Sequence, residues 1–145
     1  MTDLKPFDGD FENRVRASFD RQQVMKTIGA SMTLVAPGEV HIELPYCQSL
    51  TQQHGYLHAG IVTIIVDSAC GYAAFSLMPP DSEVLTVEYK VNFLHPAKGE
   101  KFISIGKVLK PGRTLTVCSG TVLSCGNDGE KAIAKIQATM MSVTG

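Results

Sequence analysis

Hydrophobic residues recur along this chain with two periods, one typical of helices and one typical of strands. Between Phe11 and Ile28 they return every three or four residues with charged residues between them, which predicts an amphipathic helix. Between Val84 and Leu94 they alternate with polar residues, which predicts a strand. Its apolar face would carry Leu85, Val87, Tyr89, Val91 and Phe93, and its polar face Thr86, Glu88, Lys90 and Asn92.

The least polar stretch runs from Ala59 to Leu77 and is far longer than an ordinary strand. Its second half is rich in alanine and Met78-Pro79-Pro80 stops it, so it is predicted to be a helix. A helix that is apolar on nearly every side must be enclosed by the rest of the domain.

The remaining segments predict short strands joined by turns. Two precede the long helix, at 32–35 and 40–44, and three follow the strand at 84–94, at 102–109, 114–124 and 132–143. The short turns favour an antiparallel meander. We therefore expect one α+β domain over residues 1–145, with a long central helix wrapped by an antiparallel sheet of about six strands, and a further helix near the N-terminus.

The composition fits one soluble globular domain. The 145 residues include 13 basic and 14 acidic side chains, for a net charge of -1, so no nucleic-acid surface is expected. No apolar run reaches the roughly 18 residues of a membrane span. The first ten residues lack the apolar core of a signal peptide, so a cytoplasmic location is expected. The four cysteines lack zinc-ligand spacing and are expected to be small buried hydrophobes.

Candidate chemistry gathers where the long helix begins. Ala59 and Gly60 are small, so an oxygen of a ligand can come close to the first backbone N–H groups, which have no partner within the helix. The helix dipole favours negative charge there, as in an oxyanion site. Asp67 lies farther along among uncharged neighbours, where a lone carboxylate is costly unless it is paired or used in chemistry.

Ala59 and Asp67 are too far apart to act on one substrate within a single chain. The eight residues between them rise about 12 Å along a helix. A carboxylate at that distance cannot attack a carbonyl that is held at the helix start. We therefore expect a homodimer with antiparallel central helices and sites across its interface, and a dimer of dimers stays open.

Simpler interpretations stay open for several of these residues. Asp67 can be a buried, hydrogen-bonded structural acid, and His58 can orient the backbone at the helix start rather than act as a base. His54 and His58 lie four residues apart without a third ligand, so no metal site is predicted. Gly60 and Gly71 can be packing glycines.

Four segments are distinctive in their order and spacing: His58-Ala59-Gly60, Asp67-Ser68-Ala69-Cys70-Gly71, Val91-Asn92-Phe93-Leu94-His95-Pro96-Ala97 and Gly112-Arg113-Thr114. With these segments the chain resembles the hotdog-fold acyl-CoA thioesterases, specifically the PaaI-like branch of the 4-hydroxybenzoyl-CoA thioesterase superfamily. The resemblance implies a hotdog fold and hydrolysis of an acyl-CoA, with no cofactor beyond the CoA of the substrate.

The resemblance also implies catalytic roles. Asp67 would act as the nucleophile or as the base that activates water, and the Ala59 N–H would polarise the thioester carbonyl. The side-chain amide of Gln52, with Gln53 as a neighbouring candidate, would help to hold the carbonyl. The Thr86 hydroxyl would orient water.

Contacts with CoA would come from two further segments and from Gly60 at the helix start. These contacts are assigned to Phe93, His95 and Lys98 in one segment and to Lys110, Gly112, Arg113 and Thr114 in the other. The three cations suit the phosphates of CoA, and the simpler interpretation of them is as solvated turn residues.

The chain departs from the family pattern at two positions. Ala59 stands where many members have glycine, and Gln52 stands where asparagine is common in this branch. Both departures affect the expected acyl group more than the expected reaction.

The leading hypothesis is therefore thioester hydrolysis. A non-catalytic acyl-CoA-binding hotdog module is the alternative, although such a sensor usually carries a DNA-binding segment for which there is no room here. A hotdog hydratase would need a histidine paired with an acid in a motif that this sequence does not contain.

Overall fold

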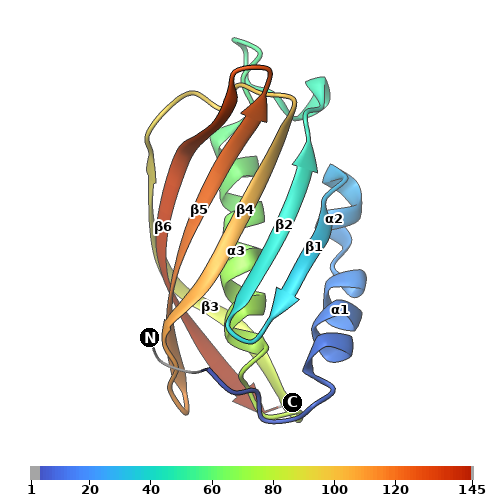
Figure 1. Cartoon of the computed structure of the whole chain (residues 1–145), viewed down its shortest axis with the longest axis vertical. Helices are drawn as coiled ribbons and strands as arrows, with labels where there is room; N and C mark the ends of the chain where they lie inside the picture. Colours follow the sequence, from blue (N-terminus) through green and yellow to red (C-terminus); the bar gives the residue numbers. More distant parts are fainter. Residues whose placement is uncertain (1–3, 145) are drawn as a thin grey trace.

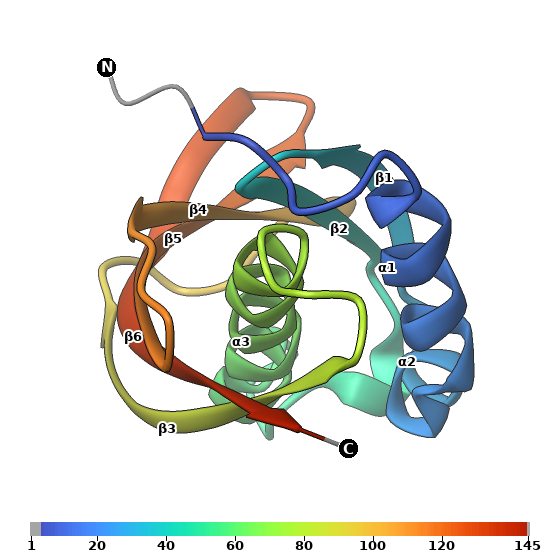
Figure 2. The same ribbon diagram turned by 90° about the horizontal axis from the view of Figure 1, so that it is seen from below.

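The computed structural model of the chain describes residues 4–144. A curved sheet of six antiparallel strands surrounds one long helix, and two short helices lie beside the first strands (Figures 1 and 2). The helices are α1 (Phe11–Arg21), α2 (Gln23–Ile28) and α3 (Ala59–Phe75), with a short 3-10 turn at Gln48–Leu50. The strands are β1 (Ser31–Ala36), β2 (Glu39–Pro45), β3 (Ser82–Phe93), β4 (Lys101–Lys110), β5 (Leu115–Gly126) and β6 (Gly129–Thr144). This is the predicted α+β hotdog architecture, with its central and N-terminal helices.

The strand order is β1-β2-β4-β5-β6-β3, so the predicted meander is wrong for β3. β4, β5 and β6 are joined by tight turns, but β3 pairs with β6 at the far edge of the sheet instead of with β4. The chain passes through α3 between β2 and β3, and it therefore emerges on the opposite side of the helix. The three later strands fill the sheet between these two positions.

The central helix packs directly on the inner face of the sheet. Ser104 on β4 donates a hydrogen bond to the carbonyl oxygen of Ile65 at 2.9 Å. Next to it, a Cβ atom at Gly106 would lie only 2.3 Å from the carbonyl carbon of Ala69. The absence of a side chain at Gly106 thus allows the strand to approach the helix backbone, and it sets the height of α3 above the sheet.

The predicted helix over 11–28 is interrupted at Gln22, whose backbone is extended (φ -80, ψ 99). The break has a packing reason. In a continuous helix the six steps from Phe19 to Met25 would turn through about 600°, which would point Met25 away from the face of Phe19. The interruption turns α2 so that Met25 and Ile28 are both buried, and it leaves Val24 exposed.

The predicted faces of β3 are wrong for its first half. The register of β3 against β6 shifts between Thr86 and Glu88, which identifies a β-bulge at Val87. Because a bulge adds one residue, Thr86 lies on the same face as Tyr89 and faces α3. The apolar side chain of Leu85 lies on the outer face and is 57% exposed.

The cysteine expectation holds at three positions of four. Cys70, Cys118 and Cys125 are buried and free, whereas Cys47 is free and exposed, because it lies in the loop that follows β2. None of the helices within residues 4–144 is long and apolar enough to cross a membrane.

Candidate active site

The N-terminus of α3 presents one free backbone donor. His58 is the N-cap residue, and its ring Nδ1 accepts a hydrogen bond from the Gly60 N–H at 2.8 Å. A Cβ atom at Gly60 would lie 3.1 Å from this nitrogen, so glycine allows the ring to fold over the helix start. Within residues 4–144 no group accepts a hydrogen bond from the Ala59 N–H. This donor points out of the positive end of the helix dipole and can bind an oxygen that gains charge.

Gln52 lies in the loop that leads into α3. Its Oε1 accepts hydrogen bonds from the backbone N–H groups of His54 and Tyr56. Both partners are donors, which assigns the oxygen of the amide to the loop and leaves its NH2 group available. Gln52 can therefore donate to a carbonyl oxygen, while Gln53 is exposed.

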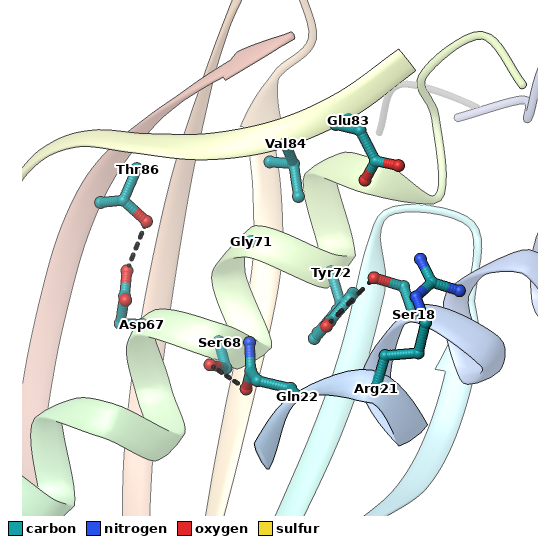
Figure 3. A pocket seen from close by; sticks show the side chains of 10 residues that line it. All are labelled: Ser18, Arg21, Gln22, Asp67, Ser68, Gly71, Tyr72, Glu83, Val84 and Thr86. Carbon is teal, nitrogen blue, oxygen red and sulfur yellow. Dashed lines mark hydrogen bonds between the residues drawn. The ribbon is translucent and has the colours of Figure 1, made fainter. Parts of the chain in front are cut away.

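Asp67 lies two turns into α3, where it is partly buried. Thr86 on β3 donates a hydrogen bond from Oγ1 to Asp67 Oδ1 at 2.8 Å (Figure 3). Burial raises the pKa of Asp67, because the charged form loses solvation, and the hydrogen bond from Thr86 opposes this shift. One carboxylate oxygen is thus held by Thr86, and among residues 4–144 no group donates a hydrogen bond to the other.

Two cavities meet at Asp67. One of about 350 Å³ extends toward the start of α3, and its walls are mainly apolar. It is lined by Ala59, Gly60, Thr63, Ile64, Asp67, Tyr89, Val91 and Phe93. The structure thus brings the predicted residues Ala59, Gly60, Asp67 and Phe93 to one cavity.

The other cavity, of about 300 Å³, lies between α1–α2 and β3 and has mainly polar walls (Figure 3). Its residues Ser18, Gln22, Ser68 and Tyr72 were not predicted from the sequence. The only available signal is that Gly71 stands four residues after Asp67, on the same face of the helix. Ser18 and Gln22 belong to a different element, and no local pattern connects them with Asp67.

The first segment predicted to bind CoA lies at the same end of the molecule as Ala59. His95 and Lys98 line a cavity of about 770 Å³ between the loop after β3 and the β5–β6 turn. Tyr56 and Lys131 line it as well, and the sequence did not single them out. Lys98 and Lys131 supply two cations, and Glu100, Asp128 and Glu130 supply three acids.

The second segment lies at the opposite end, beside the C-terminus of α3. Arg113 and Gly112 line a cavity together with Met78, which follows that terminus. A Cβ atom at Gly112 would lie 2.0 Å from the Leu115 carbonyl oxygen, so the hairpin itself requires glycine there. Thr114 accepts a hydrogen bond at its carbonyl oxygen from Ser142 N–H. Within one chain, this hairpin with Lys110 is therefore separated from Ala59 by the length of the helix.

No group of three or more His, Cys, Asp or Glu side chains able to hold a metal ion occurs in the part of the chain that the structure describes. The ring nitrogen Nδ1 of His58 is engaged with Gly60, and His54 is exposed. The groups that the site presents are the backbone N–H of Ala59, the carboxylate of Asp67 and the hydroxyl of Thr86.

Known proteins of similar sequence and structure include a thioesterase family protein and a hydrolase of a CoA ester. A thioesterase family protein from Silicibacter pomeroyi has 54% identity and a TM-score of 0.92, with 93% of this chain and 99% of that chain covered. The Escherichia coli PaaI protein, from the phenylacetic acid degradation operon, shares the fold, with a TM-score of 0.83, 15% identity and coverage of 94% and 95%. The 1,4-dihydroxy-2-naphthoyl-CoA hydrolase of Listeria monocytogenes is 23% identical, over 65% of this chain and 76% of its own.

The sequence profile of the thioesterase superfamily matches residues 54–128. The matched region contains the start of α3, Asp67, Thr86 and both segments predicted to bind CoA. The chain belongs to the thioesterase superfamily.

Proposed function

We propose that this protein hydrolyses an acyl-CoA thioester at a site shared by two chains. The observation that carries the proposal is the pairing, on one helix, of a free N–H at Ala59 with an Asp67 carboxylate held by Thr86. Family membership supports hydrolysis of a thioester. The Listeria relative, named as a hydrolase of a CoA ester, supports CoA as the thiol.

In the proposed reaction the thioester oxygen accepts a hydrogen bond from the Ala59 N–H, with the amide of Gln52 beside it. Asp67 either attacks the carbonyl carbon, forming an anhydride that water then cleaves, or takes a proton from a water that attacks the same carbon. In both routes the C–S bond breaks, and the thiolate of CoA leaves and takes up a proton. The Ala59 donor stabilises the oxyanion that forms between these steps.

The site needs two chains because α3 is a continuous helix from Ala59 to Phe75. Asp67 lies about 12 Å along its axis from Ala59. The free edge of β3 supports pairing: the strand has a neighbour on one side only, and its Tyr89 and Phe93 are 46% and 48% exposed. A long apolar edge strand without cover is a template for a second strand. We propose a homodimer in which β3 and α3 each face their antiparallel copies.

An antiparallel dimer also reunites the two predicted CoA segments. The Ala59 end of one chain then lies beside the Phe75 end of the other, where the hairpin with Arg113 is placed. Lys98 of one chain and Arg113 of the other can thus approach the phosphates of one CoA. This arrangement explains why a single chain holds these cations far apart.

The direct test is the release of free thiol from a panel of acyl-CoAs, with the Asp67→Asn variant as the inactive control. Hydrolysis of at least one acyl-CoA by the wild type, and its loss in the variant, is the expected result. Binding of acyl-CoAs without release of thiol would instead favour the non-catalytic binding module.

A further inference from the structure

The cavity between α1–α2 and β3 begins at Asp67 and ends at the break between the two N-terminal helices. Asp67 and Thr86 form its near end, and Gln22 contributes its side chain from the far wall (Figure 3). The other cavity at Asp67 is mainly apolar, so the carboxylate lies at the boundary between an apolar space and a polar one. An acyl group whose carbonyl lies at Asp67 can extend into this polar space.

The hydrogen bonds around the cavity leave donors free. Ser68 Oγ donates to Gln22 Oε1 at 3.1 Å, which assigns the oxygen of this amide to α3 and leaves its NH2 group available. Among residues 4–144 no group accepts from Gln22 Nε2. The hydroxyls of Ser18 and Tyr72 lie 3.3 Å apart and share one hydrogen bond, so one of their two hydrogens is left to donate.

The cavity is lined by charges of both signs. Arg21 contributes a cation, and Glu83 and Asp67 contribute carboxylates. A ligand carboxylate would face Glu83 and Asp67 as well as Arg21, and a ligand cation would face Arg21 as well as the two carboxylates. An uncharged group that both donates and accepts hydrogen bonds matches all of these neighbours. A hydrocarbon would displace water from these polar side chains without replacing its hydrogen bonds.

We propose that this cavity receives the far end of the acyl group and selects acyl groups that end in a hydroxyl over plain hydrocarbon chains, with Gln22 as a specificity-determining residue. The inference rests on the proposed thioesterase function and adds the chemistry of the acyl group. The backbone at Gln22 is extended, and its side chain contacts Ser68. In a continuous helix the side chain of residue 22 would point in another direction.

The test compares acyl-CoAs that differ in one group. The kcat/KM of the wild type is measured for butanoyl-, hexanoyl- and octanoyl-CoA and for their ω-hydroxy derivatives. A preference for the hydroxy derivative of about tenfold is expected at the length that reaches Gln22, in keeping with one added hydrogen bond. Gln22→Met, which keeps the length and removes the amide, should bring the ratio close to one.

Gln23→Met is the matched control, because Gln23 is the exposed neighbour and does not line the cavity. It should keep the wild-type ratio. Ser68→Ala provides a second way to release the amide of Gln22, and it should lower the ratio even if Gln22→Met folds poorly. The proposal is overturned if the wild type hydrolyses these substrates without a preference at any length, or if the folded Gln22 variant keeps the preference.

Failure of the proposed thioester hydrolysis can be distinguished from failure of this inference. If no acyl-CoA is hydrolysed, the same pairs are titrated against the wild type by calorimetry. A tenfold tighter binding of one hydroxy derivative, lost in Gln22→Met, would then support the cavity without the reaction. Equal binding of every pair would overturn the inference.

Discussion

Thr86 Oγ1 donates a hydrogen bond to Asp67 Oδ1 at 2.8 Å, across the space between the edge strand β3 and the central helix. This contact joins a β-bulge to the partly buried carboxylate. The bulge at Val87 turns Thr86 toward α3, and the hydroxyl then opposes the rise in the pKa of Asp67 that burial causes. Thr86 thus contributes to two features of the proposed chemistry, the orientation of the acid and its protonation.

Replacing Thr86 should move the pH profile. The acid limb of kcat/KM should lie above the ordinary Asp pKa of 3.8, because the reactive form is the carboxylate and burial raises its pKa. Thr86→Val removes the hydrogen bond that stabilises the charged form, so the limb should shift to higher pH. Thr86→Ser keeps the hydroxyl and should stay near the wild type. An identical limb in all three proteins would contradict the link between the two residues.

Removing the charge at Asp67 should abolish activity and raise stability. Asp67→Asn should lower kcat/KM by about a thousandfold or more, since the acid and base chemistry is lost. The pKa of Asp67 is raised in the folded protein. Its carboxyl group therefore contributes its full stabilisation only below its pKa in the unfolded chain, and this contribution is lost as the pH rises through its pKa in the folded protein. Thermal unfolding should therefore show a higher Tm for the variant near neutral pH. The gain should shrink in acid, and a lower Tm near neutral pH would show that Asp67 is a structural acid.

The role of the Ala59 N–H can be tested by deleting that hydrogen alone. Ala59 is the first residue of α3, where proline is well tolerated, and His58 before it is already extended. Ala59→Pro should keep the Tm close to that of the wild type and lower kcat by about a hundredfold or more, as for the loss of one oxyanion donor. Ala59→Ser retains the N–H and serves as the control. Full activity of the proline variant would remove Ala59 from the mechanism.

Mixing two inactive variants tests whether the site is shared. A dimer of one Ala59→Pro chain and one Asp67→Asn chain combines an intact Ala59 and an intact Asp67 in one of its two sites. Random exchange of subunits should therefore restore about a quarter of the wild-type activity. Each variant alone should stay inactive, and light scattering of the wild type should give the mass of two or four chains. A monomer, or the absence of restored activity after exchange, would place the whole site in one chain.

Arg14 should matter for stability more than its neighbours do. Its Nη2 donates to the carbonyl oxygens of Met78 at 2.9 Å and Phe75 at 3.4 Å, and the guanidinium lies 4.5 Å from the centre of the Phe75 ring. These contacts fasten α1 to the C-terminal end of α3, where a cation is favoured. Arg14→Ala should lower the free energy of unfolding by about 2 to 3 kcal/mol, as for a hydrogen bond from a charged group.

Denaturant unfolding checks this value against Arg16→Ala. Arg16 is more exposed and pairs with Glu12 four residues away, so its loss should cost only about 0.5 kcal/mol. Equal effects of the two substitutions would mean that the contacts of Arg14 contribute little.

The sequence predicts well the features that depend on neighbouring residues. The apolar run after Ala59 identifies α3, because its length and its alanine content exclude a strand. The small residues at the start of α3 and the lone Asp67 identify the candidate site. They do so because an unpaired helix end and a buried charge are both unfavourable in any fold unless a partner or a ligand satisfies them.

The errors arise where packing between distant segments changes the local pattern. Alternation in β3 predicts that Thr86 faces away from Tyr89, but the bulge places both on one face. Periodicity predicts one helix over 11–28, but burial of Met25 interrupts it at Gln22. Each error concerns the placement of a residue, Thr86 or Gln22, that lines a cavity next to Asp67.

By itself, then, the sequence determined the elements, the central helix and the acid within it, because hydrophobic period, helix ends and the cost of burying charge are local properties. Only the tertiary structure decided what surrounds that acid. Thr86 is 19 residues from Asp67, and Gln22 is 46 residues from Ser68. Contacts of that kind depend on how the sheet curves around the helix and on which strand forms its edge, and no short stretch of sequence contains that information.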